Sequence, residues 1–235
     1  MKHLVSLVLG LIVGVILFAA GLLYNPFNAD RGLSPLSVTN AEVIALNFAN
    51  VPAESIAYTN NGETLHHPHP EKVVQLWEAP VRMTSAMATV MRDARNRVAG
   101  IGVKFSSRSE STRLWTGEAI VDSVWYVYLP DYGSLFIEQT ENYFPFIREV
   151  AFPAWRSSAN HWRGNWLGDV TAGPGALGTA AVTGGSGRLE GLSMAAVESM
   201  TVKAFSAETG LVSAEGRLII EMPYDQDPAN DADTP

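Results

Sequence analysis

An alternation of apolar and polar residues with a period of two runs through most of the chain after residue 40. It is clearest over residues 212–222, where every second residue is apolar or glycine and those between are mostly Ser, Glu and Arg. Because successive side chains point to opposite faces of a strand, this pattern is typical of a strand buried on one face. The chain is therefore expected to form antiparallel sheets with one face in the core.

Three segments place two such strands around a short turn and predict β-hairpins. They cover residues 87–105, turning at 93–96; residues 118–143, turning at Pro130, Asp131 and Gly133; and residues 192–222, turning at SAETG. Shorter strands are expected at 42–48 and 177–183, whereas 51–70 and 145–170 lack a clean period. About eight strands with no long helix among them predict an all-β fold, either a closed antiparallel barrel or a sandwich.

The segment GTAAVTGGSGRLEGL, residues 178–192, contains five glycines. A phosphate-binding loop would need a helix after the glycines and a Gly-Lys-Ser/Thr or GxGxxG spacing, and the segment has neither. A hairpin turn is the better interpretation, because glycine adopts positive φ without a steric clash. We expect positive φ at Gly184, Gly185 or Gly187.

VTGGSGRLEGLSMAAVE, residues 182–198, resembles the strand–turn–strand signature of the allene oxide cyclase and dirigent-like barrels. In those families a Gly-Gly-x-Gly turn precedes a large apolar residue, another glycine and a strand of small residues. GSLFIEQTENY (133–143) and GLVSAEGRLIIEM (210–222) suit the same strand order. The resemblance covers residues 115–222 and implies an eight-stranded barrel with an apolar lumen, dimeric or trimeric in some members. It assigns no catalytic residue to a position in this chain.

Residues 4–23 form an uncharged, apolar run of twenty residues. As a helix the run would rise about 30 Å, enough to cross the hydrocarbon core of a bilayer. With Lys2 before it, the run predicts a single-pass anchor with a cytoplasmic amino terminus and a periplasmic or otherwise extracytoplasmic main domain. The alternative is a signal peptide cleaved near Ala19-Ala20-Gly21.

The composition excludes several classes of protein. The chain has no cysteine, which rules out an acylated lipoprotein, a disulfide framework, a thiol nucleophile and cysteine-based zinc or haem attachment. Its net charge of −8 argues against a nucleic-acid partner. The expected organisation is a cytoplasmic stub and anchor over 1–27, a linker over 28–40, a barrel domain over 41–223 and a disordered acidic tail over 224–235.

The aromatic-rich segment around residues 155–166 holds the first candidate ligand site. Trp155, Trp162 and Trp166 lie among glycines and serines. Large aromatic side chains there either plug one end of the barrel, line a ligand mouth, or contact a partner or a membrane surface.

Further candidates come from single strands and loops. Asp122 shares a strand face with Tyr126 and Tyr128. If that face lines the lumen, Asp122 is a candidate catalytic acid or base and the two tyrosines are ligand-binding residues; if the face is outward, Asp122 is an ordinary solvated acid. By contrast, Glu138 and Glu141 lie three apart on one strand and should face opposite sides.

Two other motifs carry weaker signals. In LHHPHPE, His67 and His69 are on one side of an extended segment, but no further ligand has an obvious spacing, so a solvated loop competes with a metal site. Gly10 and Gly14 form a GxxxG motif for a helix–helix contact, although glycine is common in membrane helices without that role. No cofactor site is indicated.

Two functions of different classes remain. The first is a membrane-anchored barrel that binds an apolar small molecule, with isomerase or cyclase activity as an extension. The second is a non-catalytic accessory subunit of a larger membrane complex, or a homo-oligomer, docked through the anchor and one outer face. A lumenal pocket with a buried ionisable group favours the first, and a packed lumen with an apolar outer patch favours the second.

Overall fold

The computed structural model describes residues 2–23, 42–49 and 84–222. The first of these segments is the helix α1 (Lys2–Leu23), whose side chains are described over residues 8–20. Its apolar side chains in that range, such as Leu11 and Phe18, are exposed. Among the described residues, no helix combines the length and apolarity that a bilayer crossing requires. The linker at 28–40 and the tail at 224–235 lie outside the described residues.

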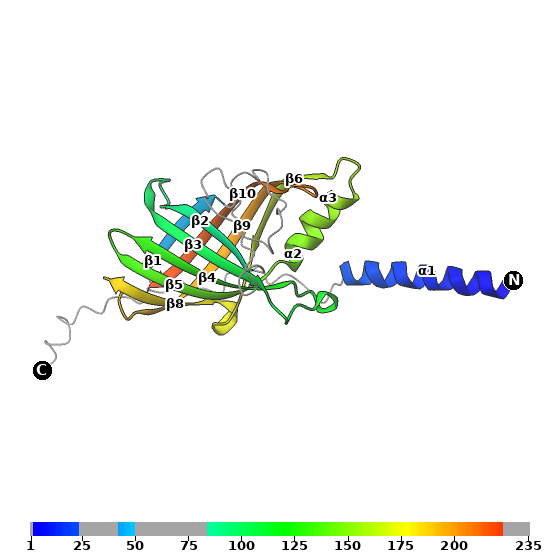
Figure 1. Cartoon of the computed structure of the whole chain (residues 1–235), viewed down its shortest axis with the longest axis horizontal. Helices are drawn as coiled ribbons and strands as arrows, with labels where there is room; N and C mark the ends of the chain where they lie inside the picture. Colours follow the sequence, from blue (N-terminus) through cyan, green and yellow to red (C-terminus); the bar gives the residue numbers. More distant parts are fainter. Residues whose placement is uncertain (1, 24–41, 50–83, 223–235) are drawn as a thin grey trace, which may run out of the picture.

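Ten strands and several short helical turns make up the rest of the described chain (Figure 1). The strands are β1 (Glu42–Ala49), β2 (Thr84–Arg92), β3 (Val98–Arg108), β4 (Ile120–Leu129), β5 (Gly133–Asn142), β6 (His161–Asp169), β7 (Thr171–Gly173), β8 (Ala180–Gly187), β9 (Ser193–Ser206) and β10 (Gly210–Met222). The helical turns are η2 (Leu114–Thr116), α2 (Phe144–Phe146), η3 (Ile147–Ala151), α3 (Phe152–Arg156) and η4 (Ala176–Gly178).

Eight of the strands form a closed ring. Their order is β10-β1-β2-β3-β4-β5-β8-β9, and pairing of β9 with β10 closes the circuit. Each of these pairings is antiparallel, and β6 and β7 add to β9 and β5 outside this path. The three predicted hairpins are confirmed as β2–β3, β4–β5 and β9–β10. The predicted antiparallel β architecture of about eight strands is likewise confirmed, in a described chain that is mostly β.

Large apolar side chains fill one half of the ring. The ring of Trp125 is fully buried and packs edge-on against Phe48, with their centroids 4.9 Å apart. Two glycines make room for them: a Cβ at Gly216 would lie 2.1 Å from the Phe48 ring, and one at Gly102 would lie 3.0 Å from Trp125. At this level the side chains span the interior, which is what an eight-stranded ring of this size accommodates.

A second apolar cluster occupies the other half. Met194 and Ala196 of β9 belong to the first cluster, whereas Met200 and Val202 of the same strand belong to the second. The two clusters therefore lie toward opposite ends of β9. Val150 from η3 packs into the second cluster, so the helical segment 144–156 covers that end of the ring.

Two details correct the sequence predictions. Gly187 has φ of +67°, as expected, but Gly184 and Gly185 lie within β8, and the chain reverses after them over residues 188–192. At Gly184 the constraint is close approach, because a Cβ there would lie 1.5 Å from the Leu189 carbonyl oxygen. Val212 is exposed rather than inward, since the β9–β10 register shifts between Leu211 and Ala214.

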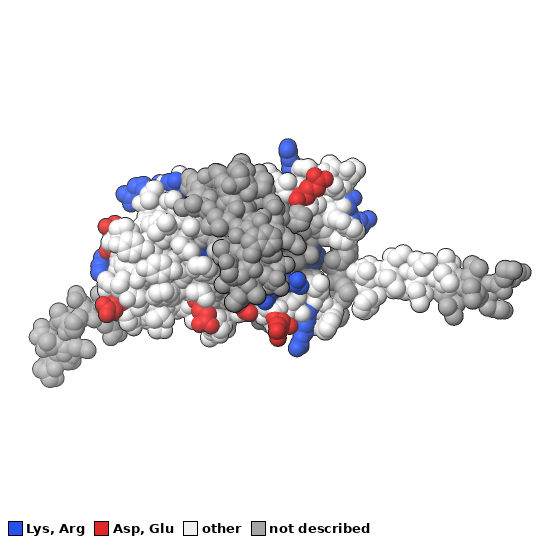
Figure 2. Space-filling model, in the orientation of Figure 1, with Lys and Arg blue, Asp and Glu red and all other residues white. Residues whose placement is uncertain are grey.

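Charges of both signs are scattered over the face of the molecule shown in Figure 2. No single-sign field is visible on the described part of that face.

Candidate functional site

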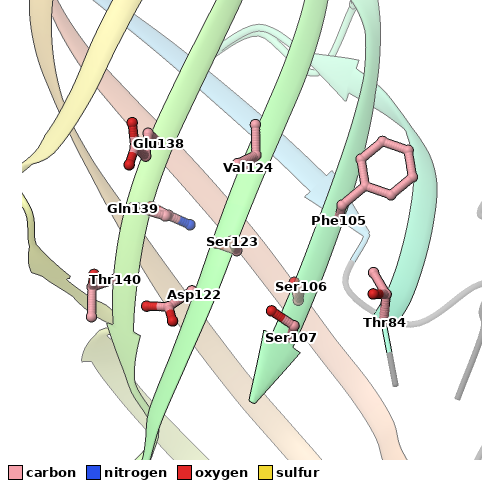
Figure 3. Close-up of a pocket in the computed structure, with 10 residues that line it drawn as sticks. All are labelled: Thr84, Phe105, Ser106, Ser107, Asp122, Ser123, Val124, Glu138, Gln139 and Thr140. Atoms are coloured by element: carbon pink, nitrogen blue, oxygen red, sulfur yellow. The ribbon is translucent and has the colours of Figure 1, made fainter. Parts of the chain in front are cut away.

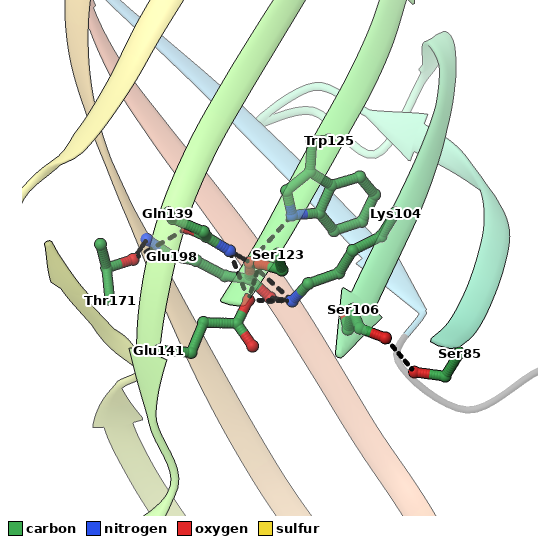
Figure 4. Close-up of polar contacts among 9 residues, drawn as sticks. All are labelled: Ser85, Lys104, Ser106, Ser123, Trp125, Gln139, Glu141, Thr171 and Glu198. Carbon is green, nitrogen blue, oxygen red and sulfur yellow. Dashed lines mark hydrogen bonds and ion pairs between the residues drawn. The ribbon is translucent and has the colours of Figure 1, made fainter. Parts of the chain in front are cut away.

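A layer of polar side chains lies inside the ring between the two apolar clusters (Figure 4). Its centre is Glu198, which occupies β9 between the residues of the first cluster and those of the second. The other members come from neighbouring inward positions of β3, β4, β5 and β7. They are Lys104, Ser123, Gln139, Glu141 and Thr171, with Trp125 on the side of the first cluster.

Lys104 joins the two carboxylates. Its Nζ lies 2.5 Å from Glu141 Oε1 and donates to both oxygens of Glu198, at 2.8 and 3.0 Å. The ammonium group also lies 5.3 Å from the centre of the Trp125 ring. Lys104 is 6% exposed, Glu198 1% and Glu141 0%, so two carboxylates and one cation are enclosed in the core.

Neutral donors complete the layer. The indole N–H of Trp125 donates to Glu198 Oε2 at 2.9 Å, and Ser123 Oγ donates to Glu141 Oε1 at 2.7 Å. Gln139 Nε2 donates to both carboxylates, and Thr171 Oγ1 donates to the amide oxygen of Gln139 at 3.1 Å. Satisfied hydrogen bonds of this kind fix the side chains in one arrangement.

One carboxylate oxygen of the layer differs from the others in its hydrogen bonding. Within the described part of the chain, Glu141 Oε2 is buried and accepts no hydrogen bond of ordinary geometry. Tyr143 interacts electrostatically with the Glu141 carboxylate. Burial, and then the charge of Glu141, raise the pKa of the Tyr143 hydroxyl well above its ordinary value. Buried polar groups are nearly always partnered, and the Tyr143 hydroxyl, whose pKa is also raised by a hydrogen bond to Glu141, is the neighbour that can serve this carboxylate.

The protonation states follow from burial and from these neighbours. Burial raises the pKa of Glu198, with Lys104 opposing the shift and Glu141 adding to it. For Lys104 burial acts to lower the pKa, but the charges of Glu141 and Glu198 outweigh it and hold the pKa well above its ordinary value. The lysine therefore stays a cation at neutral pH and is no amine nucleophile, whereas burial makes Glu198 easier to protonate than an exposed glutamate.

The layer therefore places a carboxyl with a raised pKa, Glu198, next to a fixed cation, Lys104. A carboxyl with a raised pKa serves as a general acid, and its conjugate base then accepts a proton in return. A fixed cation 2.8 Å from that carboxyl stabilises negative charge that develops nearby. Apolar clusters on both sides make the surroundings suitable for an apolar molecule.

The three candidate tryptophans do not lie together: two lie in the covered end of the ring and one lies at the surface. Trp166 is buried in the second cluster, where Trp162 packs beside it, and the Trp166 indole N–H donates to Glu149 Oε2 at 2.9 Å. Trp155 is 68% exposed on α3. The structure thus places two of the three in the covered end of the ring and one at the surface. Whether any of them binds a ligand remains a prediction.

Asp122, Tyr126 and Tyr128 lie on the outside of the ring. All three are exposed, and the inward positions of β4 belong to Ser123, Trp125 and their successors. The lumenal interpretation of Asp122 is therefore wrong, because the strand has apolar residues on both faces and the inward parity is the odd-numbered one. Glu138 and Glu141 do face opposite sides, as expected.

Asp122 instead lines a groove of about 250 Å³ on the outer surface of β3, β4 and β5 (Figure 3). The groove is lined by Thr84, Phe105, Ser106, Ser107, Asp122, Ser123, Val124, Glu138, Gln139 and Thr140.

His67 and His69, with His66, lie outside the described residues. Within the described chain, no group of three His, Cys, Asp or Glu side chains is placed to hold a metal ion. Gly10 and Gly14 lie on α1, and no described atom comes within 4 Å of a Cβ built at either glycine. The helix–helix contact stays a prediction.

Comparisons with known proteins add little to this description. No protein-family model and no curated protein matches the chain. Among solved structures, a nonspecific heme-binding cyclase that catalyses a 4 + 2 cycloaddition during neoabyssomicin biosynthesis is similar, with a TM-score of 0.41 and 9% identity. The match covers 90% of this chain and 84% of the cyclase. At that level of similarity it carries no argument about function.

Proposed function

We propose that the protein binds an apolar small molecule beside the buried polar layer and exchanges a proton with it, as an isomerase or cyclase does. Glu198 is the proton donor and acceptor, and Lys104 stabilises the negative charge that develops on the substrate. Glu141 positions Lys104, and its Oε2 accepts a hydrogen bond from a donor on the ligand in place of Tyr143. Tyr143, neutral at physiological pH, supplies a further O–H donor.

The proposal rests on one observation, the enclosure of Lys104, Glu141 and Glu198 in a core with one carboxylate oxygen unpartnered. Enclosing such a group costs stability, and replacing a buried ion pair by apolar residues is often neutral or stabilising. Ionisable groups with strongly shifted pKa values inside a barrel are therefore candidates for function rather than for stability.

The binding position is expected on the side of the second cluster. On the side of the first cluster, Trp125 and Phe48 occupy the cross-section. Toward the second cluster lie Tyr143 and the segment 144–156, which includes the π-helical turn η3. Such turns occur frequently at functional sites, and movement of this segment would open a path to Glu141.

Titration with N-phenyl-1-naphthylamine tests the proposal. This neutral dye fluoresces in apolar surroundings and carries one N–H donor for Glu141 Oε2. We expect the wild-type protein to bind it and Glu141→Gln to bind it at least about fivefold more weakly, since a hydrogen bond to a charged group contributes roughly 1.5 kcal/mol or more. Tyr143→Phe serves as a second, milder variant.

The matched control is Glu215→Gln, which removes a surface carboxylate whose side chain is 68% exposed. Its affinity for the dye should equal that of the wild type. Equal affinities in all variants, or a loss of binding only on replacement of the outer-surface residue Phe105, would contradict a site inside the ring.

We also propose that residues 4–23 anchor the protein in a membrane, with the ring domain outside the cytoplasm. The support is the uncharged run itself and the exposure of its apolar side chains over residues 8–20. Mass spectrometry of the mature protein is expected to find the complete amino terminus. A terminus near Leu22 would instead identify a cleaved signal peptide.

A further inference from the structure

An aromatic and aliphatic surface covers the outside of β3, β4 and β5. We define this outer aromatic face by Ile101, Phe105, Val124, Tyr126, Tyr128 and Phe136, which are each 39–49% exposed. The strand register pairs Ile101 with Tyr128 and Phe105 with Val124. The rings of Tyr126 and Phe136 pack at a tilt of 51° with their centroids 5.1 Å apart. The six side chains therefore form one continuous surface rather than isolated exposures.

The core does not require these residues. Each of the three strands already buries its opposite face, as Trp125 and Val127 do on β4 and Leu135 and Ile137 do on β5. A contiguous apolar patch of six side chains on a solvent-exposed face is typical of an interaction site. Tyrosine and phenylalanine are also the residue types enriched in protein interfaces.

The groove at the edge of this face carries negative charge. Asp122 on β4 and Glu138 on β5 are both exposed and lie on neighbouring strands, and Val124 separates Glu138 from Phe105 of β3 (Figure 3). Within the described chain, neither carboxylate has an ion-pair or hydrogen-bond partner. The ten residues that line the groove include no Lys, Arg or His.

We propose that the outer aromatic face docks a protein partner that presents an Arg or Lys side chain among aliphatic ones. The cation would enter the groove between Asp122 and Glu138, and an apolar neighbour of that cation would lie across Val124 on the ring of Phe105. Apolar neighbours of that cation would lie on Tyr126 and Phe136. A second copy of the chain fits less well, because a two-fold contact centred on the groove sets the same carboxylates against each other.

Fluorescence anisotropy with three labelled nine-residue peptides tests this inference on the full-length protein in detergent. The first peptide alternates Arg with Ile, the second replaces Arg by Glu, and the third replaces Ile by Ser. We expect the Arg–Ile peptide to bind at least about tenfold more tightly than either other peptide. Asp122→Asn combined with Glu138→Gln should weaken it by about fivefold to tenfold, and Phe105→Ser should weaken it as well.

A matched pair of substitutions controls for the overall charge. Asp131→Asn combined with Glu190→Gln changes the net charge equally at exposed positions away from the groove, and should alter the affinity by less than about twofold. Equal weakening by both double variants, or equal binding of the Arg and Glu peptides, would overturn the proposal. So would a dimer in sedimentation velocity that Phe136→Ser dissociates, because the face would then belong to a second copy.

Discussion

Lys104→Met is expected to destabilise the protein by about 3–5 kcal/mol at pH 8, because removing one partner of a buried ion pair leaves uncompensated charge in the core. In the wild type, the Lys104 ammonium lies within 3.0 Å of oxygens on two enclosed carboxylates. Methionine fills a similar volume, so the effect isolates the charge. Urea unfolding of the variant and the wild type measures it.

The loss should depend on pH in a defined direction. Without Lys104, which opposes the shift in the wild type, burial and the charge of Glu141 hold the pKa of Glu198 further above its value in the unfolded chain. A group whose folded pKa is raised favours folding below the unfolded pKa, near 4.5, and this contribution disappears as the pH rises through the folded value. The deficit of Lys104→Met should therefore be smaller at pH 5 than at pH 8.

The control for this variant is Lys203→Met. Lys203 pairs with Glu215 at 2.9 Å, but their side chains are 53% and 68% exposed. A surface pair contributes at most about 1 kcal/mol, so this variant should unfold close to the wild type at both pH values. If Lys104→Met behaves like Lys203→Met, the buried layer is not held together by charge.

The second large effect is expected from Trp166→Ala. Trp166 is 8% exposed, packs edge-on against Phe146 and bonds to Glu149, so it joins β6 to the helical segment that covers the end of the ring. Truncating a core tryptophan costs about 3–5 kcal/mol. Chemical denaturation monitored by circular dichroism gives the value.

Trp155→Ala provides the matched comparison, because the same atoms are removed from a side chain that is 68% exposed. Its cost should stay below about 1 kcal/mol, as for most surface substitutions. Equal costs for the two variants would mean that the end of the ring is not closed by Trp166. A partner bound at Trp155 would appear as a change in binding, not in stability.

The sequence predicts the strands well and the site poorly, for a physical reason. Alternation reports which residues share a face, and this is enough to place Leu218 and Ile220 inside and to pair β9 with β10. Alternation does not report which face is inward when both faces carry apolar residues, as on β4. For this reason the sequence alone leaves open whether Asp122 faces the interior or the solvent.

The buried layer depends on information that lies between strands. Three residues far apart in the chain, Lys104, Glu141 and Glu198, meet because β3, β5 and β9 belong to one closed ring and bury these side chains inside it. Two of the strands do carry a signal: Glu141 and Glu198 have the same parity as the apolar face of β5 and of β9. On β3 the signal is absent, because Lys104 shares its face with glycines and serine and the large apolar side chains lie on the other face. Polar residues at inward parity on several strands of one ring are the pattern that indicates such a site.

The helical cover was also missed. This cover consists of three consecutive short helical turns, α2 (Phe144–Phe146), η3 (Ile147–Ala151) and α3 (Phe152–Arg156). Pro145 lies near the start of α2, and Pro153 lies near the start of α3. Segments this short give no helical periodicity, and the prolines resemble loop signals. Their helical form depends on packing of Val150 and Phe146 into the second cluster.

The central claim is that burial in the layer raises the pKa of the Glu198 carboxyl, which prepares this group to exchange a proton with a bound molecule. The most direct measurement is a pH titration of the side-chain carboxyl carbons by NMR in protein labelled with ¹³C-glutamate, with the Glu198 resonance assigned from Glu198→Gln. We expect the Glu198 pKa to lie above the ordinary value of 4.5. A Glu198 resonance that titrates at or below 4.5 would contradict the account, because burial would then not favour the protonated form of this carboxyl.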